Sequence, residues 1–332
     1  MNTPEAVSHT SDARASFCIR GGDYEHVLGV PEAGSGITLT YEPMTPNDIF
    51  RVMLESRPFE VCEFSLANYI TLRARGESWL TAIPVFPNRA FRHGTVFTRN
   101  DSDLVALQQL EGKRIGVDDY SMTAAVWVRG LLEDDYGVDW RSITWVTGAK
   151  QRFVAPAGAR IDFVDAAPED LLLAGHVDAI IGFALKDARR PWHHRALRTV
   201  LRDSDAVELA YFERTAIYPI NHCVVLRTDV HEAHPALIDV VARAYVRAKN
   251  DAYARRLGST LVPWGKSSWA RAFDRFDGDP LPYGLTATNR RVVSRLGEYL
   301  LRQGFIENVP PIDDLFTVPS GVAFECIKPR VD

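Results

Sequence analysis

Residues 59–86 read FEVCEFSLANYITLRARGESWLTAIPVF and contain a complete strand–helix–strand unit. The apolar stretch 59–64 is followed by Ser65, a residue type that caps the N-terminus of a helix. The helical segment that follows ends at Gly76, and residues 80–86 form a second apolar strand. This order of elements predicts a largely parallel sheet that is covered by helices.

The same alternation continues on both sides of this unit. Further strands are predicted at residues 16–20, 37–41, 113–117, 143–146, 177–183 and 223–227, and helices at 47–55, 104–110, 122–135, 168–174, 235–257, 268–276 and 289–303. Two successive runs of strands and helices, followed by a helical C-terminal part, predict an α/β fold with two lobes and a ligand cleft between them.

The chain is expected to cross between the lobes twice. Residues 96–98 and 224–227 each join one run to the other, which predicts one lobe from residues 1–94 and 229–332 and the other from residues 95–228. Two lobes also agree with the length of 332 residues, because a typical single domain has about 150.

Composition excludes several classes of protein. Hydrophobic residues make up 46% and charged residues 24%, which are the values of a globular chain and not of a disordered one. No apolar run reaches the roughly 18 residues of a membrane span, so no membrane insertion is expected. With 38 basic and 43 acidic residues the net charge is −5 and no basic block occurs, so nucleic acid is not an expected partner.

Known sequence signatures of metal, cofactor and disulfide sites are absent. The four cysteines are far apart and have no CxxC spacing, which argues against a disulfide framework or a zinc site. GxGxxG, GxxxxGK[ST], HExxH and GxSxG do not occur, so we expect no organic cofactor and no metal. Residues 1–17 lack the apolar core of a secretion signal, which predicts a cytoplasmic protein.

Three segments carry candidate functional residues. In residues 85–98 (VFPNRAFRHGTVFT), Arg92 and His93 follow a predicted strand. Arginine binds carboxylates through two parallel hydrogen bonds, and histidine transfers protons near neutral pH. The alternative is a solvated turn with surface charges.

The second segment is 116–130 (GVDDYSMTAAVWVRG), where a strand runs through a turn into a helix. Ser121 is the expected N-cap, and the free N–H groups near Thr123 predict an anion site, although an ordinary cap would have the same sequence. Tyr120 either belongs to the core or faces the ligand. In the third segment, 217–227, His222 follows Asn221 at the start of an apolar strand and is either a structural residue or a catalyst.

These and neighbouring stretches resemble the 4,5-dihydroxyphthalate decarboxylase family. The similar stretches are FPNRAFRHGTVF, GKRIGVDDYSMTAAVWVRGLLEDDYGVD, VDAIIG, YPINHCVVLR and PLPYGLTATNR, of which VDAIIG is generic to binding-protein folds. The resemblance covers about residues 37–315. It implies the fold of type II periplasmic binding proteins in an intracellular enzyme.

The resemblance assigns roles position by position. It implies catalytic roles for Arg92, His93 and His222, and substrate contacts for Arg92, Tyr120, Ser121, Met122, Thr123, Ser65, Asn221 and Tyr283. The family commonly has methionine where this chain has Asn221, a departure that bears on the substrate more than on the fold.

The implied reaction is loss of CO2 from a hydroxylated aromatic acid, namely 4,5-dihydroxyphthalate, to give protocatechuate. The hydroxyl para to a carboxylate pushes electrons into the ring, which serves as its own electron sink and needs no cofactor. The two histidines suit the proton transfers, but the residues do not assign acid and base between them. The rival functions are a non-catalytic binding protein for an aromatic (di)carboxylate and a lyase that resembles chorismate dehydratase. Homo-oligomerisation stays open.

Overall fold

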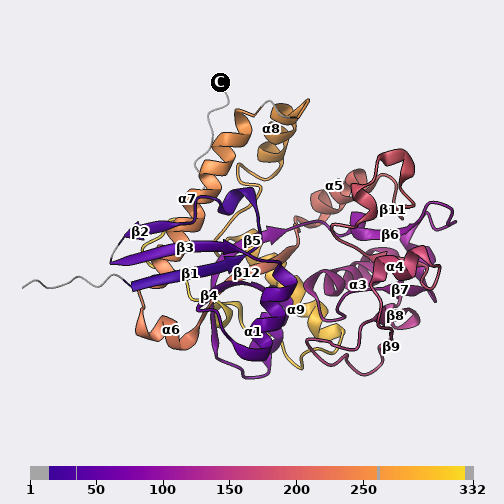
Figure 1. Ribbon diagram of the computed structural model, residues 1–332, viewed down its shortest axis with the longest axis horizontal. Helices are drawn as coiled ribbons and strands as arrows, with labels where there is room; N and C mark the ends of the chain where they lie inside the picture. The colour runs from indigo at the N-terminus through magenta and orange to yellow at the C-terminus, as the bar shows by residue number, and fades with distance from the viewer. Residues whose placement is uncertain (1–14, 35, 260–261, 326–332) are drawn as a thin grey trace, which may run out of the picture.

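The computed structural model describes residues 15–34, 36–259 and 262–325, which form two six-stranded sheets with helices around them (Figure 1). The first sheet has the order β2 (Glu32–Gly34), β3 (Ile37–Pro43), β1 (Ala15–Gly21), β4 (Val61–Ser65), β12 (Ile220–Arg227) and β5 (Leu80–Arg89). The second has the order β11 (Leu197–Thr199), β6 (Val96–Arg99), β10 (Ala179–Ile181), β7 (Arg114–Gly116), β8 (Thr144–Thr147) and β9 (Arg160–Phe163). We call the halves built on these sheets the first and the second lobe.

Helices cover the sheets and connect the strands. They are α1 (Pro46–Ser56), α2 (Leu66–Ala74), α3 (Thr123–Tyr136), α4 (Pro168–Leu173), α5 (Ser204–Thr215), α6 (Thr228–Ala233), α7 (Leu237–Leu257), α8 (Gly265–Arg275), α9 (Ala287–Arg302) and α10 (Ile312–Leu315). None of these helices combines the length and the apolar character needed to cross a membrane. Ser65 caps α2 as expected, because its Oγ accepts a hydrogen bond from the Asn68 N–H at 3.4 Å.

Two details of the expected arrangement are corrected. β12 was assigned to the lobe built from residues 95–228, but it lies in the first sheet, antiparallel to both β4 and β5. The second crossing therefore comes before Ile220. β12 is almost entirely buried, which suits the interior position between β4 and β5. Residues 104–110 form only a 3-10 turn at Leu107–Leu110 where a helix was expected.

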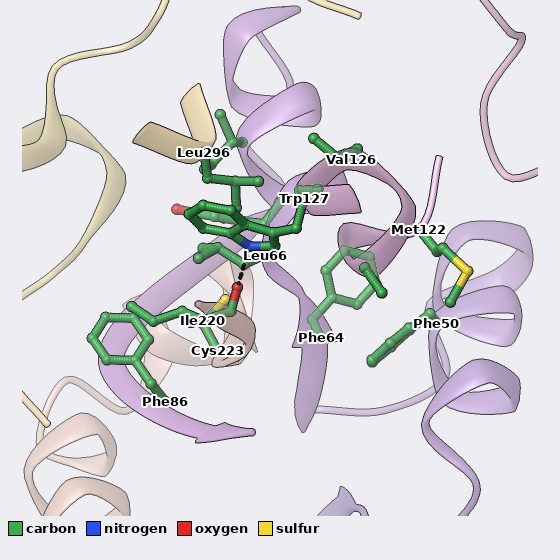
Figure 2. Packing of buried hydrophobic residues seen from close by; sticks show 14 of the residues in the cluster. Phe50, Phe64, Leu66, Phe86, Met122, Val126, Trp127, Ile220, Cys223 and Leu296 are labelled. Atoms are coloured by element: carbon green, nitrogen blue, oxygen red, sulfur yellow. Dashed lines mark hydrogen bonds between the residues drawn. The ribbon is translucent and has the colours of Figure 1, made fainter. Parts of the chain in front are cut away.

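A continuous apolar core joins the two lobes. Trp127 of α3 is buried, and its indole N–H donates to the Ile220 carbonyl of β12 at 3.0 Å. Figure 2 shows this ring among Leu66, Phe64 and Leu296, which belong to the first lobe and α9. Because the interior is packed at the density of a crystal, such contacts hold the two lobes at a defined separation.

α9 contacts both α2 and α3 and so connects the lobes along one side (Figure 1). The Tyr299 hydroxyl donates to Asp134 of α3 at 2.9 Å, and the buried Arg129 donates to Gln303 at 2.7 Å. Gly130 lies directly against the Tyr299 ring, and a Cβ at this position would overlap it.

We therefore expect Gly130→Ala to destabilise the protein by roughly 1–3 kcal/mol, because the extra methyl must push Tyr299 away from α3. Chemical denaturation measures the effect. Gly148→Ala is the control, since a Cβ there meets nothing within 4 Å and its backbone φ is ordinary. Equal stability of the two variants would show that the contact between α3 and α9 is not tight.

Candidate active site

A cavity of about 330 Å³ lies between the lobes. The first lobe contributes Tyr24, Thr45, Pro46, Asn47, Phe50, Ser65, Asn88, Asn221 and His222, and the second contributes Asp118, Met122, Thr123, Ala124, Arg152, Phe183 and Ala184. Arg92 lines the cavity from the connection between β5 and β6. Six residues singled out from sequence thus meet here: Ser65, Arg92, Met122, Thr123, Asn221 and His222.

Arg92 is a buried cation without a counter-ion among the described residues. Its side chain forms no ion pair within 4.0 Å there, and its Nε has no hydrogen-bond partner. The guanidinium lies 5.1 Å from the centre of the Phe183 ring. Burial lowers the pKa of Arg92 to about 10, so the group remains charged at neutral pH. An unpaired arginine on a cavity is suited to bind a carboxylate.

The N-terminus of α3 faces the same cavity. The N-cap is Met122 and not Ser121, and Met122 provides no side-chain cap, so the first N–H groups of the helix are available to an anion. The Thr123 hydroxyl lies 2.9 Å from that of Ser65 and accepts from the Ala67 N–H at 3.1 Å. These bonds hold the N-termini of α2 and α3 together across the cleft.

His222 is oriented by a buried carboxylate. Its Nδ1 contacts Oε1 of Glu63, which leaves Nε2 as the ring nitrogen for a ligand in the cavity. Glu63 also accepts from the Tyr24 hydroxyl at 3.0 Å and from the Gly22 N–H at 2.7 Å. Burial alone would raise the pKa of Glu63, but the interaction with His222 and these hydrogen bonds lower it below its ordinary value. Glu63 is therefore ionised at neutral pH.

Two amides extend this network along the cavity wall. The side-chain amide of Asn88 donates to the Tyr24 hydroxyl at 2.9 Å, and that of Asn221 donates to the side-chain oxygen of Asn88 at 2.6 Å. Burial raises the pKa of Tyr24, so its hydroxyl stays protonated and can donate to Glu63. The arrangement is that of an acid–base histidine held in one tautomer by a carboxylate.

The chain is similar in sequence to two proteins that are named as decarboxylases. It is 33% identical over 303 residues to the 4,5-dihydroxyphthalate decarboxylase of Comamonas testosteroni, covering 85% of this chain and 90% of that protein. The chain belongs to the 4,5-dihydroxyphthalate decarboxylase family. The enzyme of the same name from Pseudomonas putida is 38% identical over 158 residues, covering 44% of this chain and 61% of that one. No family model matches the chain.

Solved structures confirm the expected fold. The periplasmic aliphatic sulphonate binding protein SsuA of Escherichia coli superposes with a TM-score of 0.55 at 13% identity, covering 96% of both chains. The desulfurization enzyme DSZB superposes with a TM-score of 0.51 at 14% identity, covering 92% of this chain and 97% of that one. This member of the decarboxylase family therefore has the two-lobed fold of type II periplasmic binding proteins.

Four of the expected site residues lie outside the cavity. His93 is 1% exposed and packs 5.0 Å from the Tyr211 ring, between α3 and α5, although the adjacent Arg92 reaches the ligand side. Tyr120 is buried under the guanidinium of Arg129, and the Ser121 hydroxyl donates to Asp119 at 2.6 Å. Tyr283 is buried 4.6 Å from the Lys249 ammonium. The position of His93 supports a structural role and not an acid–base one.

Sequence reasoning missed Glu63, Arg152 and Asp118. Glu63 had a usable signal, because a charged residue in the middle of the buried strand FEVCEF must have a partner. Arg152 and Asp118 had none, since they lie in loops and reach the cavity only through the tertiary fold. Among the residues that the structure describes, no group of three or more His, Cys, Asp or Glu side chains is placed to hold a metal ion.

Burial lowers the pKa of His93 to about 4, against about 6.5 for an exposed histidine, so acid should destabilise the fold through this residue. The native state disfavours the added proton, and the stability present above pH 6.5 falls by up to about 3 kcal/mol as the pH drops towards 4. We expect His93→Gln to flatten this part of the stability–pH curve, and exposed His194→Gln to leave it unchanged. Denaturant unfolding across the pH range tests this expectation, which fails if the two variants give the same curve.

Proposed function

We propose that this protein decarboxylates 4,5-dihydroxyphthalate to protocatechuate. The observation that carries the proposal is the combination, on one cavity, of an unpaired Arg92 and a carboxylate-oriented His222. The membership of the decarboxylase family supports it. The cation alone would serve binding, whereas a histidine oriented by a carboxylate adds a group that can transfer protons.

Substrate binding follows from the charges of the site. One carboxylate of the substrate accepts hydrogen bonds from Arg92 and from the first N–H groups of α3. The aromatic ring then lies in a cavity whose walls include Phe50 and Phe183. Binding removes water from these groups and strengthens their interactions with charge that develops on the ring.

His222 accepts the phenolic proton and later returns it. Its Nε2 takes the proton of the hydroxyl para to the departing carboxylate, the phenolate electrons move into the ring, and the carbon that bears the carboxylate is protonated. The carbon–carboxylate bond then breaks, CO2 leaves, the bond electrons restore the aromatic ring and His222 returns its proton to the phenolate oxygen. Asp118 is the one acidic side chain among the described residues that line the cavity, and desolvation raises its pKa. It is therefore our candidate proton donor to the ring carbon. The net reaction consumes one proton.

Incubation with 4,5-dihydroxyphthalate tests the function directly. We expect stoichiometric CO2 and protocatechuate, measured by gas analysis and chromatography. Tight binding of the substrate without either product would reject the catalytic proposal and favour the binding-protein alternative.

Arg92→Ala should weaken substrate binding by about 30-fold or more, since truncating one member of a buried charged pair costs about 2–5 kcal/mol. Arg92→Lys should restore part of the affinity, because lysine keeps the charge but not the two parallel hydrogen bonds. Arg99→Ala, in β6 and away from the cavity, is the control. Unchanged affinity of the Arg92→Ala variant in calorimetry would remove Arg92 from the site.

His222→Asn should lower kcat by about 10²-fold or more without an equal loss of affinity, the usual scale for an acid–base group. Glu63→Gln replaces the carboxylate that holds Nδ1 of His222 by a neutral amide, so kcat should fall by more than the affinity for substrate does. Tyr24→Phe removes only one hydrogen bond to Glu63 and should lower kcat less. Thermal unfolding of each variant separates lost chemistry from lost structure, and an unchanged kcat in Glu63→Gln contradicts the role of the carboxylate.

A further inference from the structure

A second arginine enters the cavity from the opposite lobe. Arg152 lies between β8 and β9 in the second lobe, and its side chain crosses to the first. Its guanidinium donates to the Asn47 side-chain oxygen at 2.8 Å and, at 3.4 Å, to that of Asn68. It also lies 5.2 Å from the centre of the Phe50 ring. Arg152 is therefore a contact between the lobes as well as part of the cavity wall.

The side chain of Arg152 has neutral hydrogen-bond partners. Within the described residues no carboxylate lies within 4.0 Å of its guanidinium, whereas nearby Arg51 is paired with both Asp48 and Glu55. Burial lowers the pKa of Arg152 from its usual value, and the nearby charges of Asp119 and Asp118 oppose this change. A partly buried guanidinium that is hydrogen-bonded to amide oxygens, and that forms no ion pair among the described residues, retains the capacity to bind an anion.

Arg152 occupies a different part of the cavity from Arg92. Together with Asn47 and Asp118 it also lines an adjoining hollow of about 380 Å³, so it stands where the cavity opens beside α1. Arg92 lies in the connection between the lobes and does not border this hollow. Two cations on separate elements can therefore contact separate groups of one ligand.

We infer that Arg152 binds the second carboxylate of the substrate and makes the site selective for ortho-dicarboxylates over monocarboxylates. The inference rests on the proposed function. The incoming carboxylate replaces the long contact to Asn68, while the shorter bond to Asn47 keeps the guanidinium oriented. Because Arg152 belongs to the second lobe and Asn47 to the first, this contact also holds the lobes together over a bound diacid.

Asp118 acts on the place beside Arg152 where the second carboxylate is proposed to bind. As the acidic side chain beside Arg152 on the cavity wall, it opposes a second carboxylate when it is ionised. Desolvation raises the pKa of Asp118 while the charge of Arg152 opposes the change, and the neutral form of the side chain does not repel a carboxylate. A diacid therefore fits the charges of this end of the cavity when Asp118 is protonated.

The test compares two ligands that differ by one carboxylate. 4,5-Dihydroxyphthalate and protocatechuate are titrated by calorimetry into the His222→Asn variant, which retains both arginines. Adding Arg152→Gln should weaken binding of the diacid by about 10- to 100-fold, the range for hydrogen bonds to a charged group, and that of protocatechuate by less than about threefold. Arg152→Lys should give an intermediate loss for the diacid.

Arg51→Gln is the matched control, because Arg51 borders the adjoining hollow but not the cavity, and it should alter neither affinity. Equal losses for both ligands in Arg152→Gln, or no loss for the diacid, would overturn the inference. So would equal affinity of the parent variant for the two ligands. If the unmodified enzyme releases no CO2, the same titrations are made on it directly, so selectivity for the diacid is judged separately from catalysis.

Discussion

The ionised carboxylate of Glu63, fully buried in the first sheet, is the constraint around which the site is built. A buried charge is unfavourable unless it is paired and hydrogen-bonded, and Glu63 obtains its partners from two separate places in the chain. The Gly22 N–H and the Tyr24 hydroxyl come from the loop that follows β1, and His222 comes from β12. The same bonds that make this charge tolerable fix the imidazole at the cavity.

The position of β12 follows from this constraint. Its antiparallel pairing places His222 opposite Ser65, so the histidine stands beside the N-terminus of α2 and close to that of α3. Arg92 lies just beyond β5, the other neighbour of β12 in the sheet. The cation and the acid–base group are therefore placed by two neighbouring strands of one sheet, β5 and β12, and the second lobe brings the N-terminus of α3 to them.

Local sequence predicted much of the fold and part of the site. Alternation and capping located most strands and helices, and strand ends located Arg92 and His222, because these signals are contained within a few residues. Partner choice between distant strands is not local, and β12 was therefore assigned to the wrong sheet. Ser121 is the N-cap that the sequence predicts for α3, but its hydroxyl bonds to Asp119 and the N-cap is the next residue, Met122. Arg152 could not be found, since only the approach of the two lobes brings it to Asn47.

The contact of α9 with α2 and α3 has a consequence for the order in which the molecule forms. Both sheets and every side chain that lines the cavity precede α9 in the chain, and synthesis delivers them before the helix that connects the lobes along one side. A nascent chain that ends ahead of Ala287 contains every strand of both sheets but lacks the surface on which Tyr299 meets Gly130. The lobes are thus joined along this side late in synthesis, by a helix that contributes no residue to the cavity wall.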